Sequence, residues 1–392
     1  MKYIVILLSI FMLTGCKEKI NEVEEIDKFS INTNDIEVYD EVKLYDILNN
    51  IDENVEILSN NYEIDTNSIG NKEYEVLYKF EKKKYLYKFS INIVDTEAPI
   101  VFSGTNRTVV KGYDKDLCDL ITYGDNYTGD LKCVINGDYD INKIGTYKLI
   151  YSISDSSNNT KDVNVILNVV NSINNNTRPS TLTTPIKEVF DLYKDDNNEI
   201  GIDVSEWQGN IDFNKVKESG ITFVIMRIGV QINDEMPKLD GQYIENIRKA
   251  KEAGLKVGVY LFTIAGSVKE IEEEVDWVMD TLNGEELDLG ISFDWENWKY
   301  WNSYKISFHE MNEIANTFMK KVEENGYKAM LYSSKFYLET IWKNKYNYPV
   351  WLAHYIDGKS DYKGEYKIWQ LCNNGRVPGI YGDVDINIMY EG

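Results

Sequence analysis

The distribution of hydrophobic positions divides the chain into a strand-rich first half and a second half that alternates between two patterns. Between residues 26 and 171, stretches such as Glu73–Phe80 and Tyr85–Ile93 alternate apolar and polar residues with period two, which predicts half-buried β-strands. From Glu199 onward, short apolar stretches are followed by amphipathic stretches with helical spacing. The second half is therefore predicted to form parallel strands covered by helices.

The first half contains an internal repeat. Asp65–Gly70 precedes a tyrosine-rich strand at Tyr74–Tyr78, and Asp140–Gly145 precedes a similar strand at Tyr147–Tyr151. The two copies are about 75 residues apart. A period of this length indicates two whole domains in tandem, because solenoid repeats are shorter.

The boundaries of these domains follow from composition. Asp95–Pro99 (DTEAP) resembles the start of bacterial immunoglobulin-like modules. We therefore expect two all-β immunoglobulin-like sandwiches, at 27–97 and at 98–171. The Asn-, Ser-, Thr- and Pro-rich stretch Asn171–Pro185 predicts a linker, which we assign to 172–198.

The second half, 199–392, contains seven candidate strands. Three of these strands are each preceded by a glycine, namely Gly220, Gly254 and Gly326. A glycine that ends a helix belongs at such places. So many strands in under 200 residues predict a compact and irregular, TIM-like β/α barrel. The expected strands are Ile200–Val204, Thr222–Ile228, Lys256–Phe262, Leu289–Asp294, Tyr327–Tyr332, Pro349–Tyr355 and Tyr366–Gln370. The expected helices include Tyr243–Ala253, Val268–Leu282 and Phe308–Asn325.

The first residues have the order of a secretory signal. Lys2 is followed by the apolar run Tyr3–Leu13, which is too short to span a bilayer as a helix. Leu13–Cys16 (LTGC) resembles a bacterial lipobox, so we expect a lipoprotein signal peptide that ends at a lipidated Cys16, followed by a polar tether at 17–26. An ordinary signal peptide with a chance cysteine is the alternative. A lipid anchor would hold the chain at the outer face of a bacterial cell membrane.

Charge and cysteine content exclude some classes of function. A formal net charge of -23 argues against nucleic-acid binding, which needs a basic surface. Cys118 and Cys133 are 15 residues apart in one predicted domain and either pair outside the membrane or remain free thiols. The two histidines, His309 and His354, are expected to be structural, so we predict no metal site, no cofactor and no serine–histidine hydrolase.

Acidic residues cluster where the predicted barrel strands end. Asp203 ends the first strand, Asp294 and Glu296 end the fourth, and Asp385 lies in the closing segment 382–387. Catalytic side chains of β/α barrels come from the carboxyl ends of strands. These four acids are therefore the candidate catalytic residues.

The spacing of Asp294 and Glu296 has a chemical meaning. Residues two apart on a strand point to the same face, about 6.6 Å apart along the backbone. Repulsion between two such carboxylates favours a proton on one of them at neutral pH. Glycosidic cleavage requires a protonated acid beside an ionised partner. The alternative for this segment alone is a pair of solvent-facing carboxylates at a strand end.

The segment 199–392 contains, in this order, the motifs GIDVSEWQG at 201–209, IDF at 211–213, FVIMRIG at 223–229, GVY at 258–260, DWE at 294–296, PVWLAHY at 349–355, IWQ at 368–370, GRVPGI at 375–380 and VDIN at 384–387. This combination of motifs resembles glycoside hydrolase family 25, the Chalaropsis-type or phage-type lysozymes. The resemblance implies a flattened β/α barrel that cleaves the β-1,4 bond between N-acetylmuramic acid and N-acetylglucosamine with retention. Peptidoglycan would be its substrate, and the anchored chain would reach into the cell wall.

The resemblance also implies roles for the acids. Glu296 would be the general acid and base, and Asp294 would assist the 2-acetamido group of the substrate. Asp203 and Asp385 would tune the proton on Glu296 and position the substrate. An enzymic nucleophile at Asp294 remains an alternative to this substrate-assisted route.

Aromatic residues near the strand ends are candidates for sugar binding, with Gln370 as a hydrogen-bonding partner. Burial in the barrel core is the alternative for each aromatic residue. Two stretches, Thr263–Ala265 and Leu371–Cys372, depart from the family pattern and put subsite details in doubt. The candidate aromatic residues are Tyr260, Tyr332, Trp351, Tyr355 and Trp369.

Two other functions compete with an enzyme. The barrel could grip glycan without cutting it, as a binding module on a lipoprotein stalk. The β-sandwich modules could also present an adhesin surface to a cell-surface protein partner, alongside the enzyme. The four acids favour the enzyme.

Overall fold

The computed structural model describes residues 19–32, 35–173, 182–233, 235–343 and 347–390. Cys16 and the expected signal peptide lie outside these residues. The chain forms two compact units, Met1–Thr96 and Glu97–Gly392. Among the described residues, no helix is both long and apolar enough to cross a membrane.

The first unit is built around a long antiparallel hairpin, β6 (Gly70–Phe80) and β7 (Lys83–Val94). Its buried side chains alternate along each strand, with Val76 and Tyr78 on one strand and Ile91 and Ile93 on the other. This is the period-two pattern expected from the sequence. The other elements are β1 (Ile20–Val23), β2 (Ser30–Ile31), β3 (Asp35–Glu37), α1 (Leu44–Ile47), β4 (Leu48–Asn49) and β5 (Glu56–Ile57).

The second unit begins with a β module that repeats this arrangement. In both modules a short strand pairs with the first strand of a hairpin, and another strand runs parallel to the second strand of that hairpin. The order is β5-β6-β7 with β3 beside β7 in the first module, and β11-β12-β13-β9 in the second. The internal repeat in the sequence thus corresponds to a repeated sheet topology. An immunoglobulin-like sandwich stays a prediction for both modules. The elements are β8 (Ile100–Val101), β9 (Asn106–Val110), η1 (Leu117–Leu120), β10 (Tyr123–Gly124), β11 (Lys132–Asn136), β12 (Gly145–Ser154) and β13 (Thr160–Val170).

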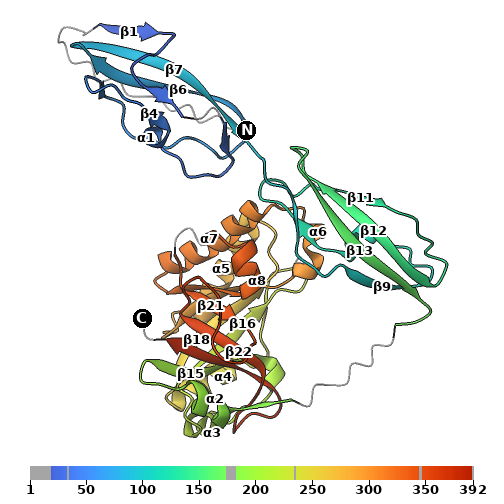
Figure 1. Cartoon of the computed structure of the whole chain (residues 1–392). Helices are drawn as coiled ribbons and strands as arrows, with labels where there is room; N and C mark the ends of the chain where they lie inside the picture. The colour runs from blue at the N-terminus through green and yellow to red at the C-terminus, as the bar shows by residue number, and fades with distance from the viewer. Residues whose placement is uncertain (1–18, 33–34, 174–181, 234, 344–346, 391–392) are drawn as a thin grey trace. The chain divides into compact units, whose positions relative to one another are not determined.

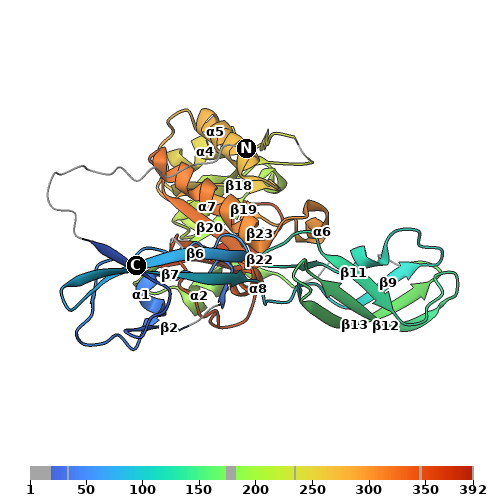
Figure 2. The ribbon, with the colours of Figure 1, turned by 90° about the horizontal axis from the view of Figure 1, so that it is seen from above.

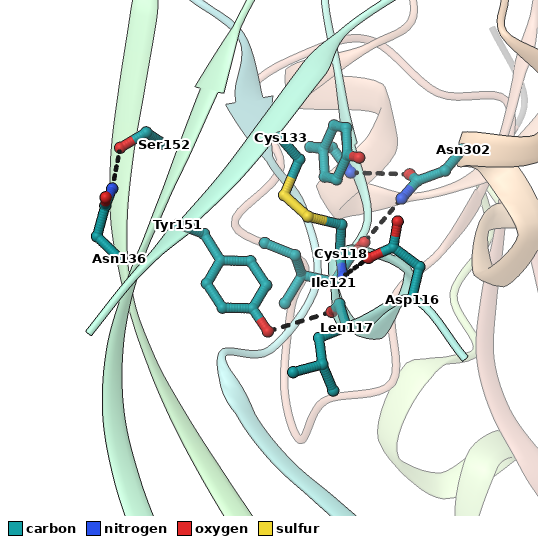
Figure 3. Close-up of a disulfide and its surroundings, with 10 residues drawn as sticks. Asp116, Leu117, Cys118, Ile121, Cys133, Asn136, Tyr151, Ser152 and Asn302 are labelled. Carbon is teal, nitrogen blue, oxygen red and sulfur yellow. Dashed lines mark hydrogen bonds between the residues drawn. A yellow bond between two sulfur atoms is a disulfide. The ribbon is translucent and has the colours of Figure 1, made fainter. Parts of the chain in front are cut away.

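A disulfide joins Cys118 of η1 to Cys133 of β11 in this module (Figure 3). The buried Tyr151 lies beside it and donates its hydroxyl hydrogen bond to the carbonyl of Leu117, 3.1 Å away. The disulfide and this hydrogen bond both tie the η1 segment to the sheet.

The remainder of the second unit is a closed ring of strands covered by helices (Figures 1 and 2). Each of the seven stretches expected to be strands overlaps a strand of the ring, and the pairing of β22 with β23 closes it. The ring strands are β15 (Asn198–Val204), β16 (Phe223–Val230), β18 (Lys256–Thr263), β19 (Gly290–Trp295), β20 (Ala329–Ser334), β21 (Val350–Ala353), β22 (Ile368–Arg376) and β23 (Val384–Tyr390). Two short strands, β14 (Thr184–Pro185) and β17 (Lys238–Leu239), pair at its margins.

The expectation of a TIM-like barrel needs correction at the closing strand. β23 runs antiparallel to both β15 and β22, whereas the other ring strands pair in parallel. Only residues 377–383 connect β22 to β23. A parallel crossover needs a dozen residues or more, so this short connection forces an antiparallel pair. A TIM barrel is therefore not supported.

Amphipathic helices cover the outside of the ring. α4 contacts β16 and β18, α7 contacts β19 and β20, and α5 packs on α7 (Figure 2). Serine side chains cap two of them, Ser267 for α5 and Ser307 for α7, as expected at helix N-termini. The helices are α2 (Ile186–Tyr193), α3 (Phe213–Glu218), α4 (Tyr243–Glu252), α5 (Val268–Leu282), α6 (Trp301–Tyr304), α7 (Phe308–Glu324) and α8 (Lys335–Thr340), with the short turns η2 (Glu206–Gln208) and η3 (Trp298–Tyr300).

Side chains alternate between the two faces of the ring. Phe223 and Ile225 belong to a small apolar cluster with Trp351, whereas Val224 and Met226 join the larger core that includes the helices. The small cluster fills the interior of the ring, because it draws on alternate positions of several neighbouring strands. The same alternation decides which polar side chains reach the interior.

Gly290, at the start of β19, lies where the backbone of this strand closely approaches the backbone of Lys328. Its φ is +80°, and an added Cβ would lie 2.1 Å from the carbonyl oxygen of Lys328. Gly284 has a similar φ of +81°, but a Cβ added there would have no atom within 4 Å. Gly284 is thus a matched control that isolates backbone strain from close approach.

We expect Gly290→Ala to lower the free energy of unfolding of the barrel by about 2–5 kcal/mol, because strain and overpacking add. Gly284→Ala should cost about 1–2 kcal/mol from strain alone. Denaturant unfolding followed by tryptophan fluorescence measures both, since all eight tryptophans lie in the barrel. An equal loss of unfolding free energy in the two variants would show that the backbone around Lys328 moves away from the added methyl group without a measurable cost.

Candidate active site

The four candidate acids meet at one rim of the ring. Asp203 lies near the carboxyl end of β15, directly opposite Asp385 near the beginning of β23. Because β23 is antiparallel, its beginning lies at the same rim as the ends of the parallel strands. Asp294 is near the end of β19, and Glu296 follows that strand immediately. The charges of all four acids influence one another's pKa values.

Buried amides hold Asp203 in place. Its Oδ2 atom accepts hydrogen bonds from Gln370 Nε2 at 2.9 Å and from Asn387 Nδ2 at 2.8 Å. The Asn387 Oδ1 atom accepts from the indole of Trp351 at 2.8 Å, and Gln370 Oε1 accepts from the hydroxyl of Tyr332 at 3.0 Å. Each amide is thus oriented by a second hydrogen bond, which fixes its donor group toward the carboxylate.

Asp203 and Asp385 form a hydrogen-bonded pair of carboxyl groups. Burial raises the pKa of both carboxyls, to about 9 for Asp385, and the two are hydrogen-bonded to each other. Asp203 also accepts two amide hydrogen bonds, which favour its ionised form. The proton of the pair therefore lies on Asp385 at neutral pH, with Asp203 as the acceptor.

Asp294 and Glu296 differ in environment although they are two residues apart. Asp294 is only 4% exposed, and its Oδ1 has no hydrogen-bond partner among the described residues. Burial, followed by the charge of Glu296, raises the pKa of Asp294 well above its usual value. The Glu296 residue reaches the surface, yet desolvation of its carboxyl and the charge of Asp203 raise its pKa to about 7.

A cleft of about 580 Å³ opens at Glu296. Tyr355 is half exposed there, and its hydroxyl donates to Gln370 Oε1 at 2.6 Å. A molecule bound in this cleft would therefore contact the carboxyl of Glu296. It would also contact Tyr355, which is hydrogen-bonded to Gln370, the amide that holds Asp203. The lining residues are Glu296, Tyr332, Ser334, Lys335, Phe336, Glu339, Ala353, His354 and Tyr355.

The aromatic residues expected to bind sugar separate into two groups. Tyr332 and Trp351 pack in the interior of the ring with centroids 4.7 Å apart, and Tyr260 meets Trp351 at 6.0 Å. Trp369 does not join them. It is buried on the outer face, edge-on to Tyr193 of α2, because it is one residue out of phase with the inward Gln370. The structure thus places Trp369 apart from the other aromatic candidates, and its role in sugar binding stays a prediction.

The histidines are held by local hydrogen bonding or helix packing. His354 lines the cleft, and its Nδ1 lies 2.8 Å from the hydroxyl oxygen of Ser360. His309 belongs to the first turn of α7, on the outside of the ring.

Sequence reasoning missed two side chains beside the acids. Asn387 is fully buried and joins Trp351 to Asp203. Arg227 is 7% exposed and donates to Asp240 from Nε at 2.8 Å and to Glu206 from Nη2 at 2.9 Å. A charged residue inside the apolar stretch 223–229, and an amide two positions after Asp385, were the available signals.

Arg227 acts electrostatically on the acids. Its positive charge lowers the pKa of Asp294, opposing the larger effect of burial. The buried carboxylate of Asp240 neutralises Arg227 in turn. The arginine is therefore a fixed positive charge near an otherwise acidic site.

Known proteins resemble the C-terminal half of the chain. The sequence profile of glycosyl hydrolases family 25 matches residues 202–380. An autolytic lysozyme of Clostridium acetobutylicum is 28% identical over 193 residues, which cover 49% of this chain and 56% of that protein. Lysozyme M1 of Streptomyces globisporus is 26% identical over 199 residues, covering 48% of this chain and 66% of that protein. The crystal structure of a bacterial lysozyme from Streptomyces coelicolor is 23% identical, covering 50% of this chain and 94% of that one, with a TM-score of 0.42.

The chain thus contains a glycoside hydrolase domain, and this domain belongs to glycosyl hydrolase family 25. The matched segment lies in the C-terminal half, as expected from the sequence motifs. The matched segment spans little more than half of the clostridial relative.

The electrostatic coupling in the site leads to a measurable shift. We expect Asp203→Asn to lower the pKa of Glu296 from about 7 toward the ordinary glutamate value, because the substitution removes the charge that disfavours ionisation of Glu296. Carbon-13 NMR titration of glutamate side chains, with the Glu296 signal assigned by its loss in Glu296→Gln, measures this pKa.

The exposed helix cap Asp212→Asn is the matched control, since asparagine keeps the capping hydrogen bond and Asp212 does not act on Glu296. An unchanged Glu296 pKa in Asp203→Asn would exclude direct coupling between the two acids.

Proposed function

We propose that the barrel is a muramidase that hydrolyses the β-1,4 bond between N-acetylmuramic acid and N-acetylglucosamine in peptidoglycan, with retention. The observation that carries the proposal is the placement of Glu296, with a pKa raised to about 7, beside the buried Asp294 at the edge of an open cleft. An acid of this strength is partly protonated at neutral pH and can transfer a proton to a leaving oxygen.

Glu296 would act twice. Its proton passes to the glycosidic oxygen as the bond to the anomeric carbon breaks, and its carboxylate then accepts a proton from the attacking water. Its raised pKa suits both steps, because a catalytic pKa near the operating pH balances acid and base forms.

Asp294 would orient the 2-acetamido group of the substrate. The N–H of that group can donate to the unpartnered Oδ1 of Asp294, which stabilises the ionised form of Asp294. Asp294 and Glu296 titrate as a pair, so ionisation of Asp294 leaves the proton on Glu296. Substrate binding would thereby favour the protonated form of Glu296, which is the form that acts as the general acid. Direct attack by Asp294 as a nucleophile is the alternative route.

Asp203, Asp385 and their amide partners would form a fixed acidic floor. The ionised Asp203 raises the pKa of Glu296, and the protonated Asp385 keeps a second full charge out of the site. Tyr355, half exposed beside Glu296, would contact a sugar ring or hydroxyl in the cleft. Tyr260, Tyr332 and Trp351 would support this floor from within the ring.

Digestion of purified peptidoglycan by the chain from Lys17 onward tests the proposal. Wild-type protein should release muropeptides with reducing N-acetylmuramic ends, identified by mass after reduction. Glu296→Gln should be slower by about 10²–10⁴-fold, because it removes the general acid. The wild-type rate should fall as pH rises through about 7, since only protonated Glu296 is active.

The control is Glu313→Gln, which makes the same change on the exposed face of α7 and should leave the rate unchanged. Binding of glycan without release of reducing ends, on acetylated and de-acetylated walls alike, would instead indicate a non-catalytic binding barrel.

We further propose that the chain is a lipoprotein at the outer face of the cell membrane and that its β modules are immunoglobulin-like. The lipobox-like Leu13–Cys16 supports the anchor, and the repeated sheet topology supports two modules of one kind. Tethering would raise the local concentration of the barrel at the wall.

In bacteria that process lipoproteins, the wild-type chain should incorporate labelled fatty acid and partition into a detergent phase. Cys16→Ala should abolish the label, because the thiol is the acceptor of the diacylglycerol group. Cys372→Ala, which removes a buried thiol, is the control and should leave labelling intact. Undiminished labelling of Cys16→Ala would place the lipid elsewhere.

A further inference from the structure

One residue of the second β module is buried in the barrel. Phe102 directly follows β8, yet it is 7% exposed and belongs to the hydrophobic core of the barrel, not to the core of its own module. Ile100 packs against the same core. The module is therefore joined to the barrel by an apolar anchor as well as by the chain.

Phe102 enters a cluster of aromatic rings. Its ring lies edge-on to Trp301 at 5.8 Å, to Tyr337 at 6.2 Å and to Trp298 at 6.4 Å, and is tilted against Phe308 at 5.9 Å. Edge-to-face pairs at such separations add to the free energy of burial. Four rings around one phenylalanine define its position closely.

Polar contacts fix the module beside this cluster. Asn302 of α6 donates from Nδ2 to the carbonyl of Ile121 at 2.9 Å and accepts from the backbone N–H of Tyr123 at 3.2 Å (Figure 3). The backbone N–H of Phe308 donates to the carbonyl of Asp125 at 2.8 Å. These bonds tie the module to α6 and to the first residue of α7.

The backbones approach closely at two glycines of the module. A Cβ on Gly124 would lie 2.5 Å from the ring of Phe308, and a Cβ on Gly129 would lie 2.1 Å from the backbone of Lys305. Side chains at either position would separate the two surfaces. The interface is thus closely fitted around residues 298–308.

This segment begins at the proposed general acid. Glu296 leads directly into η3, where Trp298 stacks on Tyr337 with centroids 3.9 Å apart and an interplanar angle of 18°. Tyr337 belongs to α8, whose residues Lys335, Phe336 and Glu339 line the Glu296 cleft. Phe102 therefore contacts Trp298, two residues after Glu296, and Tyr337, on the helix whose other residues line the cleft.

We propose that Phe102 of the β module is a positioning residue for the glycosidase site, which holds Glu296 and the α8 wall of the cleft through Trp298 and Tyr337. This inference rests on the proposed muramidase function for its catalytic consequence. The module is then part of the working enzyme and not only a spacer. The residue itself touches neither substrate nor the reacting atoms.

Several ionisable groups face Glu296 and share its environment. They come from the ring strands, from the segment after β21 and from α8, whereas the module contributes the apolar Phe102 behind Trp298. A change in the proton affinity of Glu296 on removal of Phe102 would therefore report movement of the segment. The groups are Asp203, Asp294, Tyr332, Lys335, Tyr337, Glu339, His354, Tyr355 and Asp385.

The test compares Phe102→Ala, Phe102→Met and a control, Phe190→Ala, in the chain from Lys17 onward. Phe190 also packs on the barrel core, but on α2, against Gly220. In Phe102→Ala, amide hydrogen exchange should rise at least tenfold at residues 297–307 and 335–341 while β12 and β13 stay protected. The alkaline limb of the rate profile should move to lower pH, because Glu296 becomes better solvated, and kcat should fall more than KM changes.

Phe102→Met should restore most of the wild-type behaviour, since methionine fills the same apolar site, and Phe190→Ala should leave the pH profile in place. If Phe102→Ala does not fold, Asn302→Ala removes two interface hydrogen bonds and should shift exchange and pH profile in the same direction. Unchanged exchange and pH profile in a folded Phe102→Ala would overturn the inference. If the wild type cleaves no glycan, the muramidase proposal fails, while exchange and the NMR-measured Glu296 pKa still decide the positioning role.

Discussion

Burial of carboxyl groups inside a closed ring of strands governs the chemistry of this molecule. Desolvation is the first cause of every raised pKa among the four acids, and the charges of neighbouring acids add to it. The cost is partly offset by amides from Gln370 and Asn387 and by the nearby Arg227. Asp294 lacks such compensation at Oδ1, and this is the atom at which a substrate N–H would be most effective.

The burial depends in turn on strand register. Because side chains alternate, Gln370 points into the ring and its neighbour Trp369 points out, so a slip of one residue would exchange an amide for an indole beside Asp203. The antiparallel β23 matters for the same reason. It places Asp385 opposite Asp203 and Asn387 opposite Gln370, so the closing strand completes the site as well as the ring.

Much of this was predictable from sequence because periodicity and strand-end position are local signals. The seven parallel strands and the helix Val268–Leu282 follow from their patterns, and so do the four acids. The direction of β23 and the phase of Trp369 did not follow, since both depend on pairing between distant segments. Arg227 was overlooked because a single charge in an apolar strand does not identify its partners, Asp240 and Glu206, which the fold supplies.

The contact between the second module and the barrel could not be read from sequence at all. Phe102 looks like any apolar residue near a strand, and Asn171–Pro185 has the composition of a linker that separates domains. The contact that Phe102 makes with the barrel is apolar, and this has a physical consequence. Salt screens ionic contacts at a protein surface, whereas the packing of Phe102 against Trp298 and Tyr337 does not depend on charge. An aromatic contact can therefore hold the cleft under conditions in which a salt bridge at the same place would weaken.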